Sequence, residues 1–155
     1  MQNYFELAIK EALQGVVNGE GAPFGACIVN QDQVIALAHD TVLKDNDATC
    51  HAEINAIRLA SKKLGTYNLG TSAIYCTSEP CPMCLSAIHW SGIKKCYFIA
   101  DRKCAAEYGF DDDFLYDELI KPVHQRKMSV KQELSHYHEV KHLFEYWKTT
   151  GLPIC

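Results

Sequence analysis

A histidine and two cysteines, far apart in the chain, place the strongest constraint on how this sequence can fold. His51 is followed by Ala52 and Glu53 at the start of a predicted helix, and Cys81 and Cys84 lie in the first turn of another. One imidazole and two thiolates are ligands that Zn²⁺ prefers, and three protein ligands leave a tetrahedral ion with one open position. The spacing therefore predicts a zinc site that can hold a water molecule or hydroxide.

The positions of these residues at helix starts indicate which reaction the predicted site could support. A helix N-terminus carries partial positive charge, which favours thiolate over thiol at Cys81 and Cys84. Zinc lowers the pKa of a bound water toward neutrality and so supplies hydroxide as a nucleophile. Glu53 is not needed as a fourth ligand, and beside the water it could take a proton and deliver it to a substrate.

Two other interpretations of the cysteines remain open. A structural zinc site would need a fourth protein ligand, for which Cys76 is the nearest candidate in the sequence. The thiols could also be buried without any metal. The His-x-Glu helix start, Pro80 before the first cysteine and the strand predicted between the two ligand groups favour the catalytic site.

Helices and strands are predicted to alternate along most of the chain. Periodicity and turn residues predict helices over 4–17, 51–64, 82–91, 102–108, 112–120 and 139–148, and strands over 24–29, 33–38, 71–77 and 95–100. A hairpin followed by alternating helices and strands indicates an α/β fold, with a mixed sheet that has helices on both faces.

Composition limits the classes of protein that fit. The 155 residues suit a single domain, over 1–155, with one proper core. The chain shows no signal peptide and no apolar run that could cross a membrane, so its eight cysteines indicate a reducing cytoplasm. A net charge of −4 without a cluster of basic residues makes a nucleic-acid partner unlikely.

The ligand pattern resembles the zinc-dependent cytidine deaminase superfamily, whose motif is H-x-E…P-C-x-x-C. The similarity runs from residues 23–26 through 51–53 to 77–84. It implies a three-layer α/β/α fold with a central five-stranded mixed sheet. It also implies one zinc ion per chain held by His51, Cys81 and Cys84, with Glu53 as the proton shuttle. The implied reaction is hydrolytic deamination, and a homodimer is expected.

A second stretch is similar to the guanine deaminase branch of this superfamily. Residues 105–116 read AAEYGFDDDFLY and are followed by Ile-Lys-Pro at 120–122. This resemblance implies a small purine substrate and the conversion of guanine to xanthine and ammonia. Guanosine, isocytosine or a pterin are alternative substrates, and a tRNA adenosine deaminase is a further one. A non-catalytic zinc-binding module is the alternative outside the enzymes.

The same resemblance implies a set of substrate-binding residues. Phe24 and Trp90 match positions where the branch sandwiches the base between aromatic rings. Asp112 would hold the purine, because an ionised carboxylate only accepts hydrogen bonds and guanine presents N–H donors. Ala52, between His51 and Glu53, belongs to the same set. Phe24 and Trp90 could instead be core residues, and Asp112 could belong to a solvated helix start.

Asp40 departs from the superfamily pattern. Ungapped counting from Phe24 and from His51 places Asp40 where the superfamily usually has Asn, at the end of the second predicted strand. An ionised Asp cannot donate to a ring acceptor and would repel a carbonyl oxygen, but it could accept from a ring N–H or from ribose hydroxyls. Asp40 is therefore predicted to bind substrate, with the alternative that it turns away from the pocket.

Overall fold

A computed structural model of the protein describes residues 3–154, which divide into two compact units. The first unit extends to Asp113, and the second begins at Phe114. The first unit contains the sheet and the predicted metal ligands. A single deaminase domain over 1–155 remains a prediction.

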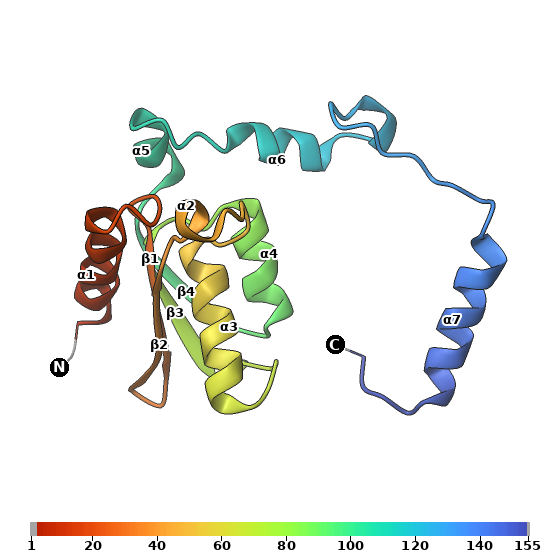
Figure 1. Ribbon diagram of the computed structural model, residues 1–155, viewed down its shortest axis with the longest axis horizontal. Coiled ribbons are helices and arrows are strands. Elements are labelled where there is room, and N and C mark those ends of the chain that lie inside the picture. Colours follow the sequence, from red (N-terminus) through yellow and green to blue (C-terminus); the bar gives the residue numbers. More distant parts are fainter. Residues whose placement is uncertain (1–2, 155) are drawn as a thin grey trace. The chain divides into compact units, whose positions relative to one another are not determined.

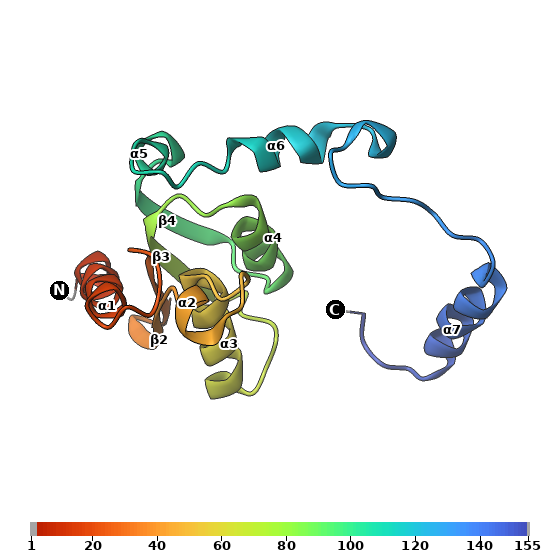
Figure 2. The same ribbon diagram turned by 45° about the horizontal axis from the view of Figure 1, so that its top comes forward.

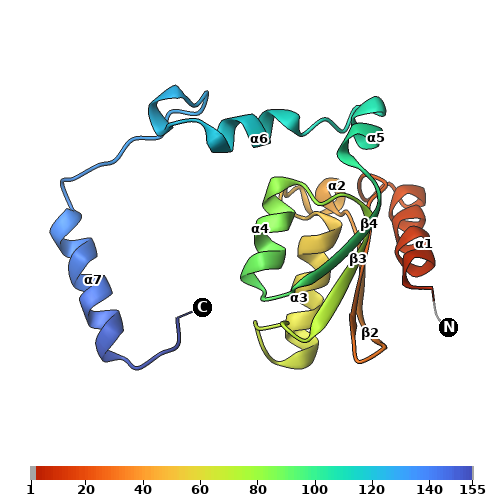
Figure 3. The same ribbon diagram turned by 180° about the vertical axis from the view of Figure 1, so that it is seen from behind.

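A mixed sheet of four strands forms the centre of the first unit (Figure 3). Its strands are β1 (Gly25–Asn30), β2 (Gln33–His39), β3 (Ser72–Ser78) and β4 (Lys95–Ala100). Their order is β2-β1-β3-β4, with β1 antiparallel to both of its neighbours and β3 parallel to β4.

The predicted five-stranded sheet is wrong by one strand, because among residues 3–154 the sheet has four strands. Between β4 and residue 154 the chain forms helices and loops and no further strand. Asp101 caps the next helix by accepting a hydrogen bond from the Cys104 amide at 2.8 Å, which commits the segment to a helix immediately after the strand. The wider α/β prediction of a mixed sheet between helices is confirmed.

Helices cover both faces of this sheet (Figures 1 and 2). One face is covered by α1 (Tyr4–Val17), and the other by α3 (Ala52–Leu64) together with α4 (Pro82–Trp90). Gly25 lets α1 approach β1 closely, because a Cβ there would collide with the carbonyl oxygen of Ala8. The bounds of α1 are those predicted from the sequence.

The two faces of the sheet have separate hydrophobic cores because side chains alternate along each strand. On β1, Ala26 and Ile28 point into the core under α3 and α4, whereas Cys27 and Val29 point into the core under α1. The larger core also contains Ile74 of β3. These cores hold the ends of the strands in place, and the functional residues lie at those ends.

Five further helices complete the described part of the chain. They are α2 (Val42–Asp45), α5 (Arg102–Glu107), α6 (Asp113–Ile120), the 3₁₀ helix η1 (Val123–Gln125) and α7 (Tyr137–Thr149). Neither α2 nor η1 was expected from the sequence. All residues of α7 are exposed, including Leu143 and Phe144. No helix among residues 3–154 is long and apolar enough to span a membrane.

Candidate metal centre and active site

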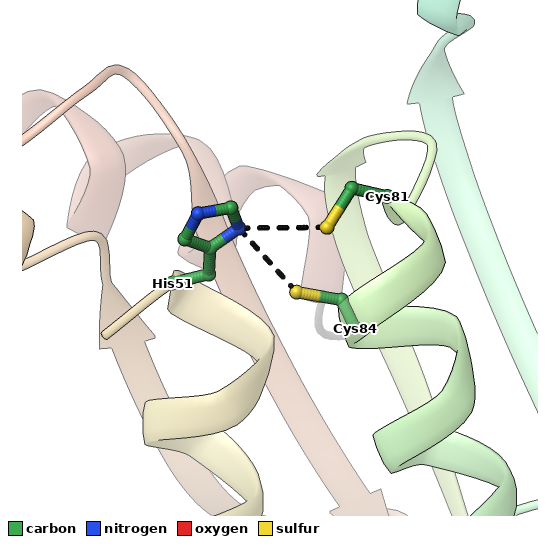
Figure 4. A group of neighbouring side chains, drawn as sticks. All are labelled: His51, Cys81 and Cys84. Carbon is green, nitrogen blue, oxygen red and sulfur yellow. Dashed lines mark hydrogen bonds between the residues drawn. The ribbon is translucent and has the colours of Figure 1, made fainter. Parts of the chain in front are cut away.

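The three predicted metal ligands converge at the starts of α3 and α4 (Figure 4). His51 is the N-cap residue of α3, Cys81 is the N-cap residue of α4, and Cys84 lies in the first turn of α4. Neither N-cap residue makes a side-chain capping hydrogen bond, so the imidazole and the thiol are directed at each other instead. The Nδ1 atom of His51 lies 3.7 Å from Cys81 Sγ and 3.5 Å from Cys84 Sγ.

These separations fit a single tetrahedral zinc ion. Zinc binds sulfur at about 2.3 Å and nitrogen at about 2.0 Å, so a tetrahedral angle separates the two donor atoms by about 3.5 Å. All three donor atoms lie within 4.8 Å of one another, and no fourth residue among 3–154 joins the group. Cys76, the candidate fourth ligand, is instead buried in the core. The donor set is that of an open site rather than a closed structural one.

Hydrogen bonds among the three metal-ligand side chains shift the pKa values of the two cysteines. The hydrogen bond from Cys84, together with the one from His51, lowers the pKa of Cys81 to about 4 although burial opposes this shift. The hydrogen bond between Cys84 and Cys81 also raises the pKa of Cys84. The hydrogen bond between His51 and Cys81 raises the pKa of His51. Cys81 is therefore a thiolate at neutral pH, the form of cysteine that binds metals.

Glu53 lies in the first turn of α3 and is only 8% exposed. Burial raises the pKa of its carboxyl group, so this group keeps a proton at higher pH than a solvated glutamate does. A carboxyl group with a raised pKa is suited to both accept and donate a proton near neutral pH. This is the property required of the predicted proton shuttle.

A cavity of about 680 Å³ opens onto this centre, within the usual range of small-molecule sites of roughly 300–1,000 Å³. His51, Glu53 and Cys81 form part of its wall. The ionisable residues that line it are otherwise Asp40, Glu79, Asp111, Asp112 and Arg102. The cavity therefore combines several carboxyl groups with a single guanidinium group, which disfavours a phosphorylated ligand.

Asp40 follows the last residue of β2, lines the cavity, and is 2% exposed. Its Oδ1 atom accepts hydrogen bonds from the backbone amides of Ala22 at 3.1 Å and Val42 at 3.2 Å. Gly21 permits this contact, because a Cβ at that position would collide with Oδ1. Asp40 thus lines the cavity and also bonds to the surrounding backbone, and its contact with substrate remains a prediction.

The other predicted substrate residues divide into two groups. Phe24 and Asp112 line the cavity, and the Phe24 ring packs edge-to-face on Phe110 with centroids 5.0 Å apart. Burial, and then the nearby Cys81, raises the pKa of Asp112. Ala52 is buried in the core, and Trp90 is 75% exposed at the end of α4; neither belongs to the cavity wall. Their substrate contacts remain predictions.

Some residues of the site were not predicted. Arg102 lines the cavity and pairs with Asp113 at 3.3 Å, while its backbone amide donates to Glu79 Oε2 at 3.0 Å. A single arginine after a strand carries no pattern that separates it from an ordinary surface residue. Glu79 lies within the stretch 77–84 that carries the resemblance, so its position next to the site could have been expected.

A partly buried histidine network supports the loop that precedes β1. His39 Nδ1 lies 2.9 Å from Glu11, and His39 Nε2 lies 2.7 Å from Glu20, which also pairs with Lys44 at 3.1 Å. Burial lowers the pKa of His39, but the hydrogen bonds to Glu20 and Glu11 outweigh it and raise the pKa on balance. The network joins α1, β2 and the loop that forms part of the cavity wall.

Comparison with known proteins agrees with this geometry. The family model for the cytidine and deoxycytidylate deaminase zinc-binding region matches residues 1–100. Guanine deaminase of Bacillus subtilis (strain 168) is 44% identical over 131 residues, which is 84% of each chain. A tRNA-specific adenosine deaminase of Buchnera aphidicola subsp. Schizaphis graminum is 31% identical over 145 residues, covering 94% of this chain and 92% of that one.

The similarity extends to three dimensions. The X-ray structure of guanine deaminase from Bacillus subtilis superimposes with a TM-score of 0.92 at 39% sequence identity, covering 100% of this chain and 99% of that one. Sequence motif, donor geometry and fold thus agree. The chain belongs to the cytidine and deoxycytidylate deaminase family, in its guanine deaminase branch.

Proposed function

We propose that this protein is a zinc-dependent aminohydrolase that converts guanine and water to xanthine and ammonia. The proposal rests on one observation: the His51, Cys81 and Cys84 donor set and the buried Glu53 lie at the same cavity. The similarity to guanine deaminase of Bacillus subtilis supports guanine as the substrate.

The residues of the site would divide the work of the reaction. Zinc, held by His51, Cys81 and Cys84, would supply a nucleophile derived from water near neutral pH. Glu53 would take up the proton that the water releases and pass it to a ring nitrogen, and then to the leaving amine. The C–N bond to the amine breaks as the C–O bond forms, so one water enters and one ammonia leaves.

The wall of the cavity suits a flat, donor-rich ring. Phe24 would contact the face of the base, and Asp112 and Asp40 would accept hydrogen bonds from its N–H groups. Ala52 and Trp90 complete the proposed substrate-binding set, on the strength of the family resemblance alone. A small purine, rather than nucleic acid, is the proposed partner because the cavity is acidic and the chain has a net charge of −4.

Deamination of adenosine in tRNA is the second candidate function. The similarity to a tRNA-specific adenosine deaminase over 145 residues favours it. A tRNA partner calls for a basic surface, whereas the cavity has one cationic side chain, Arg102, among its lining residues. Guanosine, isocytosine and pterins remain alternatives for the same chemistry.

A homodimer and a cytoplasmic location belong to the same proposal. Tyr97, Phe98 and Ile99 leave the outer strand β4 with exposed apolar side chains, and such surfaces favour association with another chain. The cysteines from Cys27 to Cys104 are free thiols, as expected in a reducing compartment. Light scattering on the purified protein tests the dimer.

An ammonia-release screen of the zinc-loaded protein tests the function. The substrates are guanine, guanosine, adenine, cytosine, isocytosine, a pterin and a tRNA anticodon stem. Guanine should be deaminated most rapidly. Activity on the anticodon stem without activity on free bases would establish the second candidate, and tightly held zinc without any turnover would identify a non-catalytic zinc module.

A further inference from the structure

We propose that protonated His39 is a positioning residue for the substrate cavity, and that the cavity binds guanine less tightly once His39 has lost its proton. This inference rests on the proposed function, because it concerns how tightly the cavity holds guanine. His39 does not itself belong to the cavity wall, so it acts through the segments that do.

Two carboxyl groups face the two nitrogen atoms of the His39 ring. Nδ1 lies 2.9 Å from Glu11 Oε1, and Nε2 lies 2.7 Å from Glu20 Oε2. An ionised carboxylate only accepts hydrogen bonds, and a neutral imidazole has a single N–H to donate. The imidazolium form is therefore required for both bonds, and loss of the proton leaves one ring lone pair directed at a carboxylate oxygen.

The charges around the ring favour the same protonated form. Lys44 pairs with the second oxygen of Glu20 at 3.1 Å, and Asp45 and Arg58 line a small cavity together with the ring. Three carboxylates, the two partners of the ring and Asp45, thus lie near two cations, and a proton on the ring balances these charges. Burial lowers the pKa of His39, but the hydrogen bonds to the two carboxylates outweigh burial and raise the pKa on balance.

Glu20 connects the ring to the wall of the substrate cavity. Its backbone amide donates to the carbonyl oxygen of Gly15 in α1 at 2.9 Å. Its carbonyl oxygen accepts from the amides of Leu43 and Lys44 in α2, at 3.1 and 3.0 Å. Leu43 lines the cavity, and so does Gly21, the residue after Glu20. One residue thus ties the ring to the loop and to α2, which both form part of the wall.

Loss of the proton breaks a link to the cavity wall whichever bond the ring gives up. If the neutral ring keeps its bond to Glu11, the Glu20 side chain is released together with the loop. If the ring keeps its bond to Glu20, β2 loses its bond to α1, whose Val16 lines the same cavity. The ring packs so closely on Gly15 that a Cβ there would collide with it, so a movement of the ring is passed on to α1.

The experiment measures the dissociation constant of guanine at about pH 6 and about pH 9 by equilibrium dialysis with the radiolabelled base. Zinc-loaded Glu53→Gln protein is used, so that guanine is not consumed and the Glu53 carboxyl group does not titrate. The constant should be at least about 5-fold larger at the higher pH, a typical coupling between two sites. Other groups that titrate in this range, including guanine itself, are common to all the variants compared.

Two substitutions added to this protein should remove the pH dependence in opposite ways. His39→Gln removes the cation, so the constant should stay near its high-pH value at both pH values. Glu11→Gln places at Nδ1 an amide that can accept from the imidazolium or donate to the neutral ring, so both bonds persist and the constant should stay near its low-pH value. His142→Gln changes an exposed histidine that lies 3.0 Å from Glu145, and should leave the pH dependence unchanged.

A nuclear magnetic resonance titration of the His39 ring tests the coupling without any change at His39. Because linkage is reciprocal, the pKa of His39 should be higher with guanine bound than in the free protein. The difference should equal the base-10 logarithm of the ratio of the two limiting dissociation constants, or about 0.7 for a ratio of about 5. A merely structural role of His39 predicts the same pKa in both forms.

Several results would overturn the inference. They are equal pKa values of His39 in the free and bound protein, an unchanged pH dependence in His39→Gln, and an unchanged pH dependence in Glu11→Gln. If a variant does not fold, the titration of the His39 ring decides. Ammonia release from guanine by the unsubstituted protein is measured separately. Turnover without coupling would refute the inference alone, coupling without turnover would refute the proposed function alone, and no binding of guanine at either pH would refute both.

Discussion

Replacing Glu53 by Gln should greatly slow turnover and at the same time stabilise the fold. The carboxyl group is 8% exposed, and its burial raises its pKa. Gln has nearly the same shape but cannot carry charge or shuttle a proton. Loss of a general acid–base residue lowers kcat by about 10²- to 10⁴-fold, whereas zinc content should not change because Glu53 is outside the ligand set.

The gain in stability has a defined pH dependence. A carboxyl group whose pKa is raised by folding destabilises the native state above its unfolded pKa, because the unfolded chain releases the proton more readily. Gln removes this penalty, which is about 1–3 kcal/mol for a buried polar group that is imperfectly paired. The variant should therefore melt about 2–10 °C higher than the unsubstituted protein at pH 8. The difference should become small as the pH falls to about 4, where Glu53 is mostly neutral in both states.

Calorimetric melting curves in the presence of a chelator measure this difference, because chelation keeps zinc affinity out of the comparison. Glu6→Gln is the matched control, since Glu6 also lies in the first turn of a helix but is exposed. The control should shift the melting temperature little at either pH. A Glu53→Gln protein that is less stable at pH 8, or that gains the same amount at pH 4 and pH 8, would refute the assignment of Glu53 as a buried carboxyl group with a raised pKa.

Three further changes should have distinct effects. Cys84→Ala should reduce zinc content measured by mass spectrometry and abolish ammonia release, and a chelator should do the same reversibly to the unsubstituted protein. His39→Gln should lower the melting temperature by roughly 2–6 °C at pH 6 but by less at pH 9. The pKa of His39 is raised by folding, so protonated His39 stabilises the fold below about pH 6.5. This stabilisation is lost as the pH rises through the pKa of His39 in the folded state. Gly21→Ala should raise the KM for guanine by about 10-fold or more in steady-state assays, because its methyl group would displace Asp40 from its position against the loop; an unchanged KM would show that the loop tolerates the methyl group.

The reaction centre is the part most accessible to sequence reasoning. His51, Cys81 and Cys84 can be grouped from the order of residues alone, since few chemistries need one imidazole and two thiolates at helix starts. The helix and strand positions are also largely predictable, because caps and periodicity are local signals; α1 and β4 have the predicted bounds. The number of strands in the sheet could not be predicted in this way, because the expected number came from a family pattern rather than from a local signal.

Residues that act through distant neighbours are the hardest to assign. The contact of Asp40 with Ala22 and Val42 joins a strand end to a loop and a short helix, and no sequence spacing encodes this. Trp90 illustrates the opposite case, in which a family position predicts a substrate contact while the side chain is 75% exposed. Arg102 is part of the cavity wall because of how α5 follows β4, which only the fold determines.

The two helix starts at the metal centre have an electrostatic consequence. Both α3 and α4 direct their positive ends at the place where a divalent cation would bind, which by itself repels the ion. The two sulfur ligands must therefore offset the field of two helices as well as the charge of the ion. Exchanging one thiolate for a neutral ligand would remove one of the two negative charges that offset these fields, and with it a metal–sulfur bond. An ion held there keeps more of its electron-withdrawing power than the count of ligand charges suggests, and this power is what hydrolysis of an aromatic amine requires.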